Sequence, residues 1–416
     1  MENFLTIAVI LLALIVFLGF FNEKVTKITY EISLMLFSVG VGGILLLIGI
    51  VFRDSSLNQV INRLQFVDLH SFLMEGILCF MLFAGSCHTK LLDFKKFARP
   101  VSLLAILTTL LGACFYGFLF YGAGLLLKLN LSLPVCLMFG SIIAPTDPIA
   151  ATSILKKFNL PSGISFIIEG ESLLNDGVGV ALFVCFSNIV MANEGGGFVT
   201  IMLKELFGAI FVGICVTAIC FPLFRRTNDS SRKIFTSLLA VSLAYVLCEI
   251  FGFSGAIASV VCGVLFSATR NYFAIKKQPI ELEKFDTFWE ILDNLLNSLL
   301  YVILGLSFVE IIRMPHVLIL SAIAIVINLI SRGSSLAITS LLTGPLPDGY
   351  NRPRFIALLT WGGLRGGLSV ALAMSTQEMV DDKTYHIILG GTFALVFFTT
   401  IVQGLTMPKV YNKIKV

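Results

Sequence analysis

Long apolar runs, separated by short polar connections, form the dominant pattern of the sequence. A run of about 18 or more apolar residues is long enough for a helix to cross a bilayer. We count thirteen such runs, and the weakest division falls at Phe251–Gly255, where glycine and serine favour a turn. The predicted spans are 3–21, 28–52, 66–87, 100–128, 132–156, 163–191, 200–222, 234–250, 253–270, 286–312, 315–342, 354–376 and 384–410. The pattern predicts an all-α, polytopic membrane protein with thirteen transmembrane helices.

The composition agrees with this class. Of the 416 residues, 57% are hydrophobic and only 13% are charged, whereas soluble proteins carry about 25% charged residues. The first apolar run has no basic residue before it and no small-residue cleavage site after it, which favours a retained helix over a signal peptide. We therefore expect one membrane domain over residues 1–416, with no soluble regulatory domain.

The basic residues give the predicted orientation. Of the 29 lysines and arginines, 21 fall in connections on one side of the predicted spans and six on the other, while Arg332 and Arg365 fall inside helices. Cytoplasmic connections collect lysine and arginine. The sequence thus predicts an N-terminus outside the cell, a cytoplasmic C-terminus, and a location in the cytoplasmic membrane. The net charge of +4 needs no nucleic-acid partner to explain it.

Two predicted spans contain residues that interrupt a helix. The fifth carries Ala144–Pro148, in which Pro145 and Pro148 each remove a backbone donor and push the preceding residue away from helical geometry. Asp147 is therefore expected in an unwound stretch. The twelfth span carries Trp361–Gly367, whose four glycines weaken the helix. Unwound backbone at membrane depth is tolerated only inside protein or beside a water-filled cavity, and paired interruptions are typical of transporter sites.

The two interruptions also suggest an internal repeat. The fifth and twelfth spans are seven helices apart, so they run in opposite directions. This offset fits two inverted six-helix repeats, helices 1–6 and 8–13, joined by helix 7 and crossing at the two breaks. The halves share no visible sequence identity, so the prediction depends on the breaks alone.

The most informative polar segment is Glu169–Asp176, which lies inside the apolar run 164–190. A charge at the centre of a bilayer costs roughly 2.5–3.5 kcal/mol on insertion scales, and such residues by default indicate a path for ions or protons. Positions four apart share a helix face. Ser172 therefore lies in line with Asp176, and Glu171 with Asn175.

These side chains predict a cation site next to the fifth-span break. Small hard cations prefer carboxylate, hydroxyl and carbonyl oxygens. Asp176, Ser172 and Thr146 can supply all three, and Asn175 and Asp147 complete the candidate ion- and proton-binding residues. The Asp176 carboxylate can hold either a partly dehydrated Na⁺ or a proton, and one acid that alternates between the two ions describes an exchanger.

Two buried arginines have separate predicted roles. Arg332, inside the eleventh span, needs a partner, and Glu171 is the best candidate for a structural ion pair. Arg365 lies in the second break, two residues after Gly363, where it compensates either Asp147 or the helix ends at the crossing, in a structural or a regulatory role. Asp147 can also serve as a cap at the break, and Glu169 can line a funnel at the cytoplasmic entry.

Several motifs together resemble the monovalent cation:proton antiporter family of the NhaP and NHE type. They are Thr146-Asp147-Pro148, Glu171-Ser172 followed by Leu173-Leu174-Asn175-Asp176-Gly177, and Gly362-Gly363-Leu364-Arg365-Gly366. None of them is specific alone, but the resemblance covers nearly the whole chain in the same order.

The resemblance implies roles for these residues. The aspartate matching Asp176 carries the cation and the proton, the positions matching Ser172 and the Thr146 carbonyl help to ligate the ion, and the pair matching Glu171 and Arg332 is structural. The Asn-Asp form implies electroneutral exchange, and the family fold implies a homodimer. We expect core helices over about 66–191 and 286–410, and dimerisation or scaffold helices over about 1–52 and 200–270.

One departure from the family pattern stands in the third span. Many relatives carry an acid after Leu-Phe, whereas Leu82-Phe83 is followed here by Ala84. A contact made by that acid is therefore lost or rerouted.

Other functions fit the residues less well. The nine cysteines lie singly in apolar runs, and neither a His-Glu-x-x-His nor a Gly-x-Ser-x-Gly motif occurs, so we expect no enzyme and no cofactor beyond the transported Na⁺ and H⁺. A channel would need a symmetric filter or rings of charge. A K⁺/H⁺ or Li⁺-accepting antiporter, or a cation-coupled solute symporter on a related fold, remains an alternative. In each case, we expect membrane lipid to surround the protein.

Overall fold

The computed structural model describes residues 2–51, 77–87, 91–147, 162–191, 198–275, 282–311, 317–346 and 350–414, and their regular secondary structure is entirely helical. The helices of the first half are α1 (Glu2–Phe21), α2 (Tyr30–Val51), α5 (Leu78–Cys87), α6 (Leu91–Leu103), α7 (Thr109–Leu126), α8 (Leu133–Ile143), α10 (Ser162–Met191) and α11 (Phe198–Arg226). Those of the second half are α12 (Ser230–Phe251), α13 (Gly255–Ile275), α14 (Glu283–Ile311), α15 (Val317–Leu342), α16 (Arg352–Trp361), α17 (Gly367–Met374), α18 (Asp382–Phe397) and α19 (Gly404–Ile414). Short π or 3₁₀ segments are η1 (Asn22–Thr26), η3 (Leu104–Thr108), η6 (Ser375–Glu378) and η7 (Phe398–Gln403).

Eight of the described helices are long and apolar enough to cross a membrane. Four shorter apolar helices accompany them, at Tyr30–Leu45, Leu78–Cys87, Leu133–Ile143 and Gly255–Thr269. The chain is thus a multi-pass helical membrane protein. The total of thirteen spans and the inverted repeat remain predictions, and residues 148–156 of the predicted span 132–156, including Pro148, lie outside the described residues.

The helix that begins the fourth predicted span starts earlier than its apolar run indicates. Helices α6 and α7 are joined by the π segment η3, so that the chain is helical from Leu91 to Leu126 and passes through Pro100. The basic residues before Pro100 favoured the prediction of a polar connection over residues 91–99. They instead occupy the first turns of a helix whose continuation is apolar.

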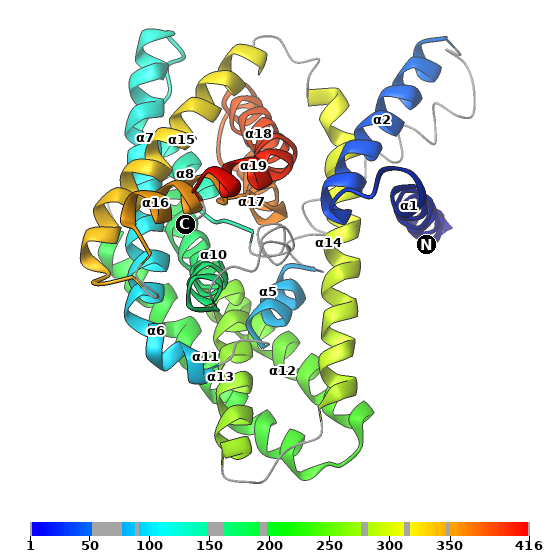
Figure 1. Cartoon of the computed structure of the whole chain (residues 1–416), viewed down its shortest axis with the longest axis vertical. Helices are drawn as coiled ribbons and strands as arrows, with labels where there is room; N and C mark the ends of the chain where they lie inside the picture. The colour runs from blue at the N-terminus through cyan, green and yellow to red at the C-terminus, as the bar shows by residue number, and fades with distance from the viewer. Residues whose placement is uncertain are drawn as a thin grey trace.

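The helices form three packing groups (Figure 1). Helices α7, α8, α10, α15, α17 and α18 pack against one another, α11–α13 form a second group, and the long α14 packs along α2 and α1. Helix α5 packs against α13 and also touches α14. These contacts join helices from both predicted domains, so the division into core and scaffold stays a prediction.

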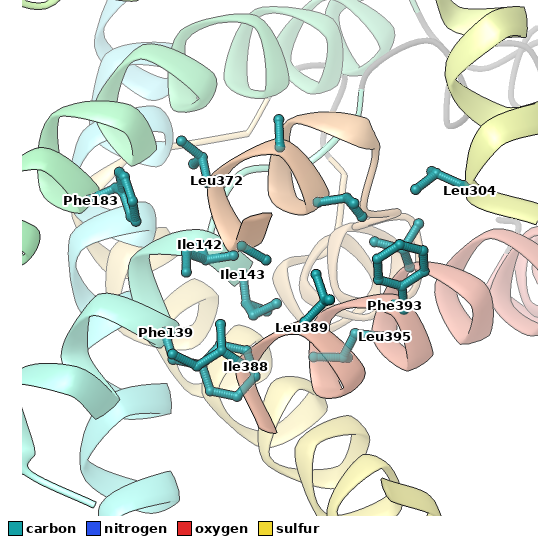
Figure 2. Packing of buried hydrophobic residues seen from close by; sticks show 14 of the residues in the cluster. Phe139, Ile142, Ile143, Phe183, Leu304, Leu372, Ile388, Leu389, Phe393 and Leu395 are labelled. Atoms are coloured by element: carbon teal, nitrogen blue, oxygen red, sulfur yellow. The ribbon is translucent and has the colours of Figure 1, made fainter. Parts of the chain in front are cut away.

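The first group is held by an interior of large apolar side chains. Figure 2 shows Phe139 of α8 against Ile388 of α18, with Ile143 and Leu389 nearby. The α7–α8 contact is so close that a Cβ on Gly140 would clash with the carbonyl oxygen of Ala113. Many outward side chains are also large and apolar (examples are Phe17, Phe211 and Phe235), as a surface in contact with lipid requires.

The two predicted interruptions are present and touch each other. Helix α8 ends at Ile143, and the stretch between α16 and α17 is non-helical from Gly362 to Gly366. The backbone N–H of Asp147 donates to the carbonyl oxygen of Leu364 at 2.8 Å. A Cβ on Gly366 would lie 2.7 Å from Asp147 Oδ2, so the crossing needs glycine at this position. The unwound segments therefore pack directly against each other.

Candidate functional site

Helix α10 brings its polar residues to the first break. The Asn175 amide donates to Thr146 Oγ1 at 2.7 Å and accepts from the Thr146 backbone N–H at 3.3 Å. The hydroxyls of Thr146 and Ser172 lie 3.0 Å apart. Asn175 also donates to Glu171 Oε1 at 3.2 Å, one helical turn back. All four residues are buried, so this network fixes the position of Thr146 relative to α10.

Glu171 and Arg332 form a two-point ion pair between α10 and α15. Arg332 Nη1 lies 2.9 Å from Glu171 Oε1, and Nη2 lies 3.1 Å from Oε2. A Cβ on Gly363 would lie 3.1 Å from Arg332 Nε, so the second break approaches the arginine closely. The structure brings together the two residues that the sequence proposed as partners, and extends their network through Asn175 to the first break.

Arg365 binds the end of α8. Its Nη1 donates to the carbonyl oxygens of Ala144 at 2.6 Å and Pro145 at 2.7 Å, and its Nη2 donates to Asn328 Oδ1 at 2.9 Å. The last carbonyls of a helix lack intrahelical donors and carry partial negative charge, which a guanidinium satisfies. Of the two roles left open by the sequence, the hydrogen bonds place Arg365 at the helix end.

The backbone of Arg365 is held by a π segment. Its N–H donates to Thr399 Oγ1 at 3.0 Å, and Thr400 Oγ1 donates to its carbonyl oxygen at 3.5 Å. Both threonines lie in η7, which interrupts the α-helical geometry between α18 and α19. A π segment widens a helix locally and often occurs at functional sites. Here it supplies hydroxyl partners to the second break.

Asp147 has a partner on the opposite side of the break. The hydroxyl of Tyr301, in α14, donates to Asp147 Oδ2 at 2.6 Å. Tyr301 is almost entirely buried. Hydrogen bonds to a charged acceptor are short and strong, so this bond ties the first break to α14.

A cavity of about 80 Å³ lies between α5, α14 and the two breaks. Its polar lining includes Thr146, Asp147, Asp176, Asp293 and Asn297. No lysine, arginine or histidine among the described residues lines it. All three carboxylates are half-buried, and partial desolvation of charged groups without a lining cation is costly. The cavity is therefore suited to a cation or to protons.

The predicted ion-binding residues divide into two sets. Thr146, Asp147 and Asp176 line the cavity, whereas Ser172 and Asn175 lie behind Thr146 and are not among its described lining residues. The Ser172 hydroxyl is therefore turned toward the Thr146 hydroxyl. Gly363 and Pro145 lie at the crossing as predicted from the sequence, and Pro145 also lines the cavity.

Helix α14 contributes polar residues to the site that were not predicted from the sequence. Asp293, Asn297 and Tyr301 follow one another at four-residue intervals and form a polar line toward the cavity and Asp147. The Asn297 amide donates to Asp293 Oδ1 at 3.1 Å. An acid inside the predicted span 286–312, with polar residues four and eight positions later, was the available signal. Asn328 and Thr399, which hold Arg365, were also missed.

Ala84 lies inside an apolar cluster rather than in the cavity. Its side chain is buried among residues of α11, α12 and α13, and its neighbour Leu82 lines the cavity. The described residues of α5 that line the cavity are Leu78, Met81, Leu82 and Gly85, and none of them carries a polar side chain.

The fold and this site define a class of protein. The chain combines apolar membrane-crossing helices with two interrupted segments that touch beside an acidic cavity, which is the arrangement of a secondary ion transporter. Residues 36–413 match the family described as "Sodium/hydrogen exchanger, transmembrane", and the chain belongs to that family.

Named relatives and a solved structure agree with this assignment. The chain is 29% identical to the Na⁺/H⁺ antiporter NhaP of Pseudomonas aeruginosa, over 97% of this chain and 95% of that protein. It is 33% identical to the Na⁺/H⁺ antiporter NhaH of Halobacillus aidingensis, over 74% of this chain and 76% of that protein. The fold is similar to that of the sodium proton antiporter MjNhaP1 from Methanocaldococcus jannaschii, with a TM-score of 0.79, 18% identity and 99% of each chain covered.

Proposed function

We propose that the protein exchanges Na⁺ for H⁺ across the cytoplasmic membrane, and that the two ions compete for the carboxylate of Asp176. The observation that carries this proposal is the position of Asp176 in an acidic cavity beside two touching helix breaks. Asp147 is engaged by Tyr301, and Asp293 by Asn297. The Asp176 carboxylate, by contrast, has no hydrogen-bond partner among the described residues. It is therefore the acid best placed to exchange ligands.

The ligand set of the proposed cation follows from the same geometry. Asp176 supplies the carboxylate, and Thr146 supplies an oxygen from the unwound backbone or its side chain. Ser172 and Asn175 position Thr146 from behind, through the hydroxyl and amide contacts. In this arrangement, the proton must leave Asp176 before Na⁺ binds, because one carboxylate cannot hold both.

One carboxylate that alternates between one Na⁺ and one proton gives electroneutral exchange. Alternating access requires the site to face each side in turn, and the movement would occur between the expected core helices, over about 66–191 and 286–410, and the expected scaffold helices, over about 1–52 and 200–270. We include in the proposal a homodimer, with the N-terminus outside and the C-terminus in the cytoplasm, as the resemblance and the basic-residue asymmetry suggest.

Proton flux in proteoliposomes tests the proposal. Vesicles holding an acid-inside gradient receive NaCl, KCl, LiCl or choline chloride, with the voltage clamped by valinomycin and K⁺ in the trials without added KCl. Na⁺-dependent alkalinisation that is lost in Asp176→Asn supports exchange at this residue, and the salt series identifies the accepted ions. Transport that survives in Asp176→Asn would exclude this carboxylate as the carrier. The absence of cation-dependent flux in the wild type would exclude exchange.

A further inference from the structure

Helix α14 places a carboxylate in the cavity that the proposed exchange does not yet use. Asp293 lines the cavity together with Asp147 and Asp176, but it belongs to a different helix from either of them. Its side chain is half-buried, and the Asn297 amide donates to its Oδ1. The carboxylate is thus held in place while it remains accessible from the cavity.

Asp293 lies at a different level of α14 from Tyr301, the residue that contacts the first break. Asp293 and Tyr301 are eight positions apart, which corresponds to about 12 Å along a helix axis. Tyr301 contacts Asp147, so Asp293 lies two turns nearer the start of α14 at Glu283. Under the predicted orientation, this start is the cytoplasmic end.

We infer that Asp293 is a positioning residue that attracts the cation into the cavity and sets its apparent affinity, while Asp176 carries it; this inference rests on the proposed function. A fixed carboxylate raises the local concentration of cations in a low-dielectric cleft. Because the cavity has no basic residue among its described lining, the Asp293 charge acts there without a lining counter-charge. Its removal lowers the attraction for the cation without removing the acid that exchanges ligands.

The test compares Asp293→Asn, Asp293→Glu and the wild type in Na⁺-dependent proton flux. Asp293→Asn is expected to raise the apparent KM for Na⁺ about five- to tenfold, to leave the maximal rate within about twofold, and Asp293→Glu is expected to restore the wild-type KM. Glu290→Gln is the matched control, because Glu290 lies on the exposed face of the same helix. An unchanged KM in Asp293→Asn, or a lost maximal rate with unchanged KM, would overturn the inference.

A binding measurement separates this inference from the proposed function. The Na⁺ concentration that gives half of the maximal thermal stabilisation reports cation binding without transport. If the wild type is stabilised by Na⁺ and Asp293→Asn requires severalfold more Na⁺, the role of Asp293 stands even where no exchange is detected. If exchange is detected and Asp293→Asn binds Na⁺ as the wild type does, only the role of Asp293 is wrong.

A second, independent observation concerns a small chamber of about 10 Å³ that is lined by Ala144 of the first break and by several polar side chains. Its lining includes Thr108 of η3, Tyr116 of α7, Ala144 at the end of α8, Arg332 of α15 and Arg365. Thr108 Oγ1, Tyr116 Oη, Arg332 Nε and Arg365 Nε are buried there without a hydrogen-bond partner among the described residues. The exposed fractions of these four side chains are only 1–4%.

The chamber matches the size and hydrogen-bonding capacity of one water molecule. A volume of about 10–15 Å³ available to a water-sized probe holds one water, which needs two to four polar partners. Two Nε–H groups can donate to its lone pairs, and the oxygens of Thr108 and Tyr116 can accept its two hydrogens. We propose that a single ordered water binds here and links the two buried arginines to η3 and α7.

A double-mutant cycle tests the water site. If Thr108 and Tyr116 share one water, the changes in melting temperature of Thr108→Val and Tyr116→Phe will not add in the double variant. Thr339→Val combined with Tyr116→Phe is the control, because Thr339 is also buried and unpartnered but is not among the chamber-lining residues. Additive changes in the Thr108 and Tyr116 pair would overturn the proposal.

The same cycle is repeated with chloride replaced by gluconate, because two arginines could instead hold a small anion. The proposal expects the same melting temperature and the same coupling in both salts. A coupling that is present in chloride and absent in gluconate would show that the chamber binds an anion, and would overturn the assignment of water.

Discussion

Glu171 and Arg332 meet at two points in the interior of the protein, with Nη1–Oε1 at 2.9 Å and Nη2–Oε2 at 3.1 Å, although the two residues are 161 positions apart in the sequence. The pair connects α10, which carries Asp176, to α15, whose Asn328 holds Arg365. The ion pair therefore braces both breaks without lining the cavity. Its contribution to transport is expected to act through the stability of the bundle.

Breaking the ion pair from either side should destabilise the fold. Removal of one partner of a buried pair leaves an uncompensated charge and typically costs about 3–5 kcal/mol. We expect Glu171→Gln and Arg332→Gln each to lower the melting temperature strongly in detergent. The double variant should lose less than the sum of the two, because it leaves no isolated charge. A fully additive double variant would contradict this account of the pair.

The bond from Tyr301 to Asp147 is expected to matter for both stability and flux. Tyr301→Phe removes a hydroxyl that donates to a carboxylate at 2.6 Å, and hydrogen bonds to charged groups contribute about 1.5–3 kcal/mol. The variant should therefore melt at a lower temperature and transport more slowly. Tyr385→Phe, a change at a half-buried tyrosine of α18 outside the cavity lining, is the control. Equal behaviour of the two variants would show that the hydroxyl of Tyr301 is dispensable.

The breaks and the polar face of α10 could be predicted because their signals are local. Two prolines within four residues, a glycine-rich stretch and charges inside an apolar run each report on their own backbone or solvation. The partners of these residues could not be predicted in the same way. Tyr301 in an apolar helix reads as a packing residue, and only the approach of α14 brings it to Asp147.

The lining of the cavity also depends on contacts between helices, which local sequence signals do not predict. A small rotation of α10 decides which of its hydroxyls faces the cavity. In the structure, the Ser172 hydroxyl contacts the Thr146 hydroxyl and does not face the cavity. The π segment η7, which supplies Thr399, contains neither proline nor glycine. It forms inside the fold, where the threonine hydroxyls meet the backbone of the second break.

The N-terminus of α18 provides a pH-dependent test outside the membrane-spanning segments. The Asp381 carboxylate accepts from the Thr384 backbone N–H at 3.2 Å, and hydrogen bonds from Thr384 hold the pKa of Asp381 below its ordinary value of 3.8. A lowered pKa in the folded state stabilises the protein above the unfolded-state pKa, and this stabilisation disappears as the pH falls through the folded-state pKa. The contribution should thus be constant from about pH 7 to pH 5.

Asp381→Ala is expected to cost about 0.5–1 kcal/mol near pH 7, since it removes an exposed N-cap. The difference from the wild type should shrink toward pH 3 in melting experiments. Asp381→Asn keeps a side-chain oxygen for the cap and does not titrate, so it should remain close to the wild type near pH 7. A loss in Asp381→Ala that does not change with pH would argue against the titration of this cap.

The contact of Gly366 with Asp147 gives the sharpest test of the crossing. A Cβ at position 366 would lie 2.7 Å from Asp147 Oδ2 and 2.9 Å from Asp147 Cβ, so Gly366→Ala must push the two breaks apart. Overpacking of this kind typically costs about 1–3 kcal/mol of unfolding free energy. Because Asp147 also lines the cavity, we expect Gly366→Ala to lower Na⁺-dependent flux even where the variant remains folded.

Gly122→Ala is the matched control, because nothing lies within 4 Å of its added Cβ. In the helix interior of α7, that change should be neutral or stabilising by up to about 1 kcal/mol. If Gly366→Ala transported as well as Gly122→Ala, the close contact of the two breaks would not be needed for exchange.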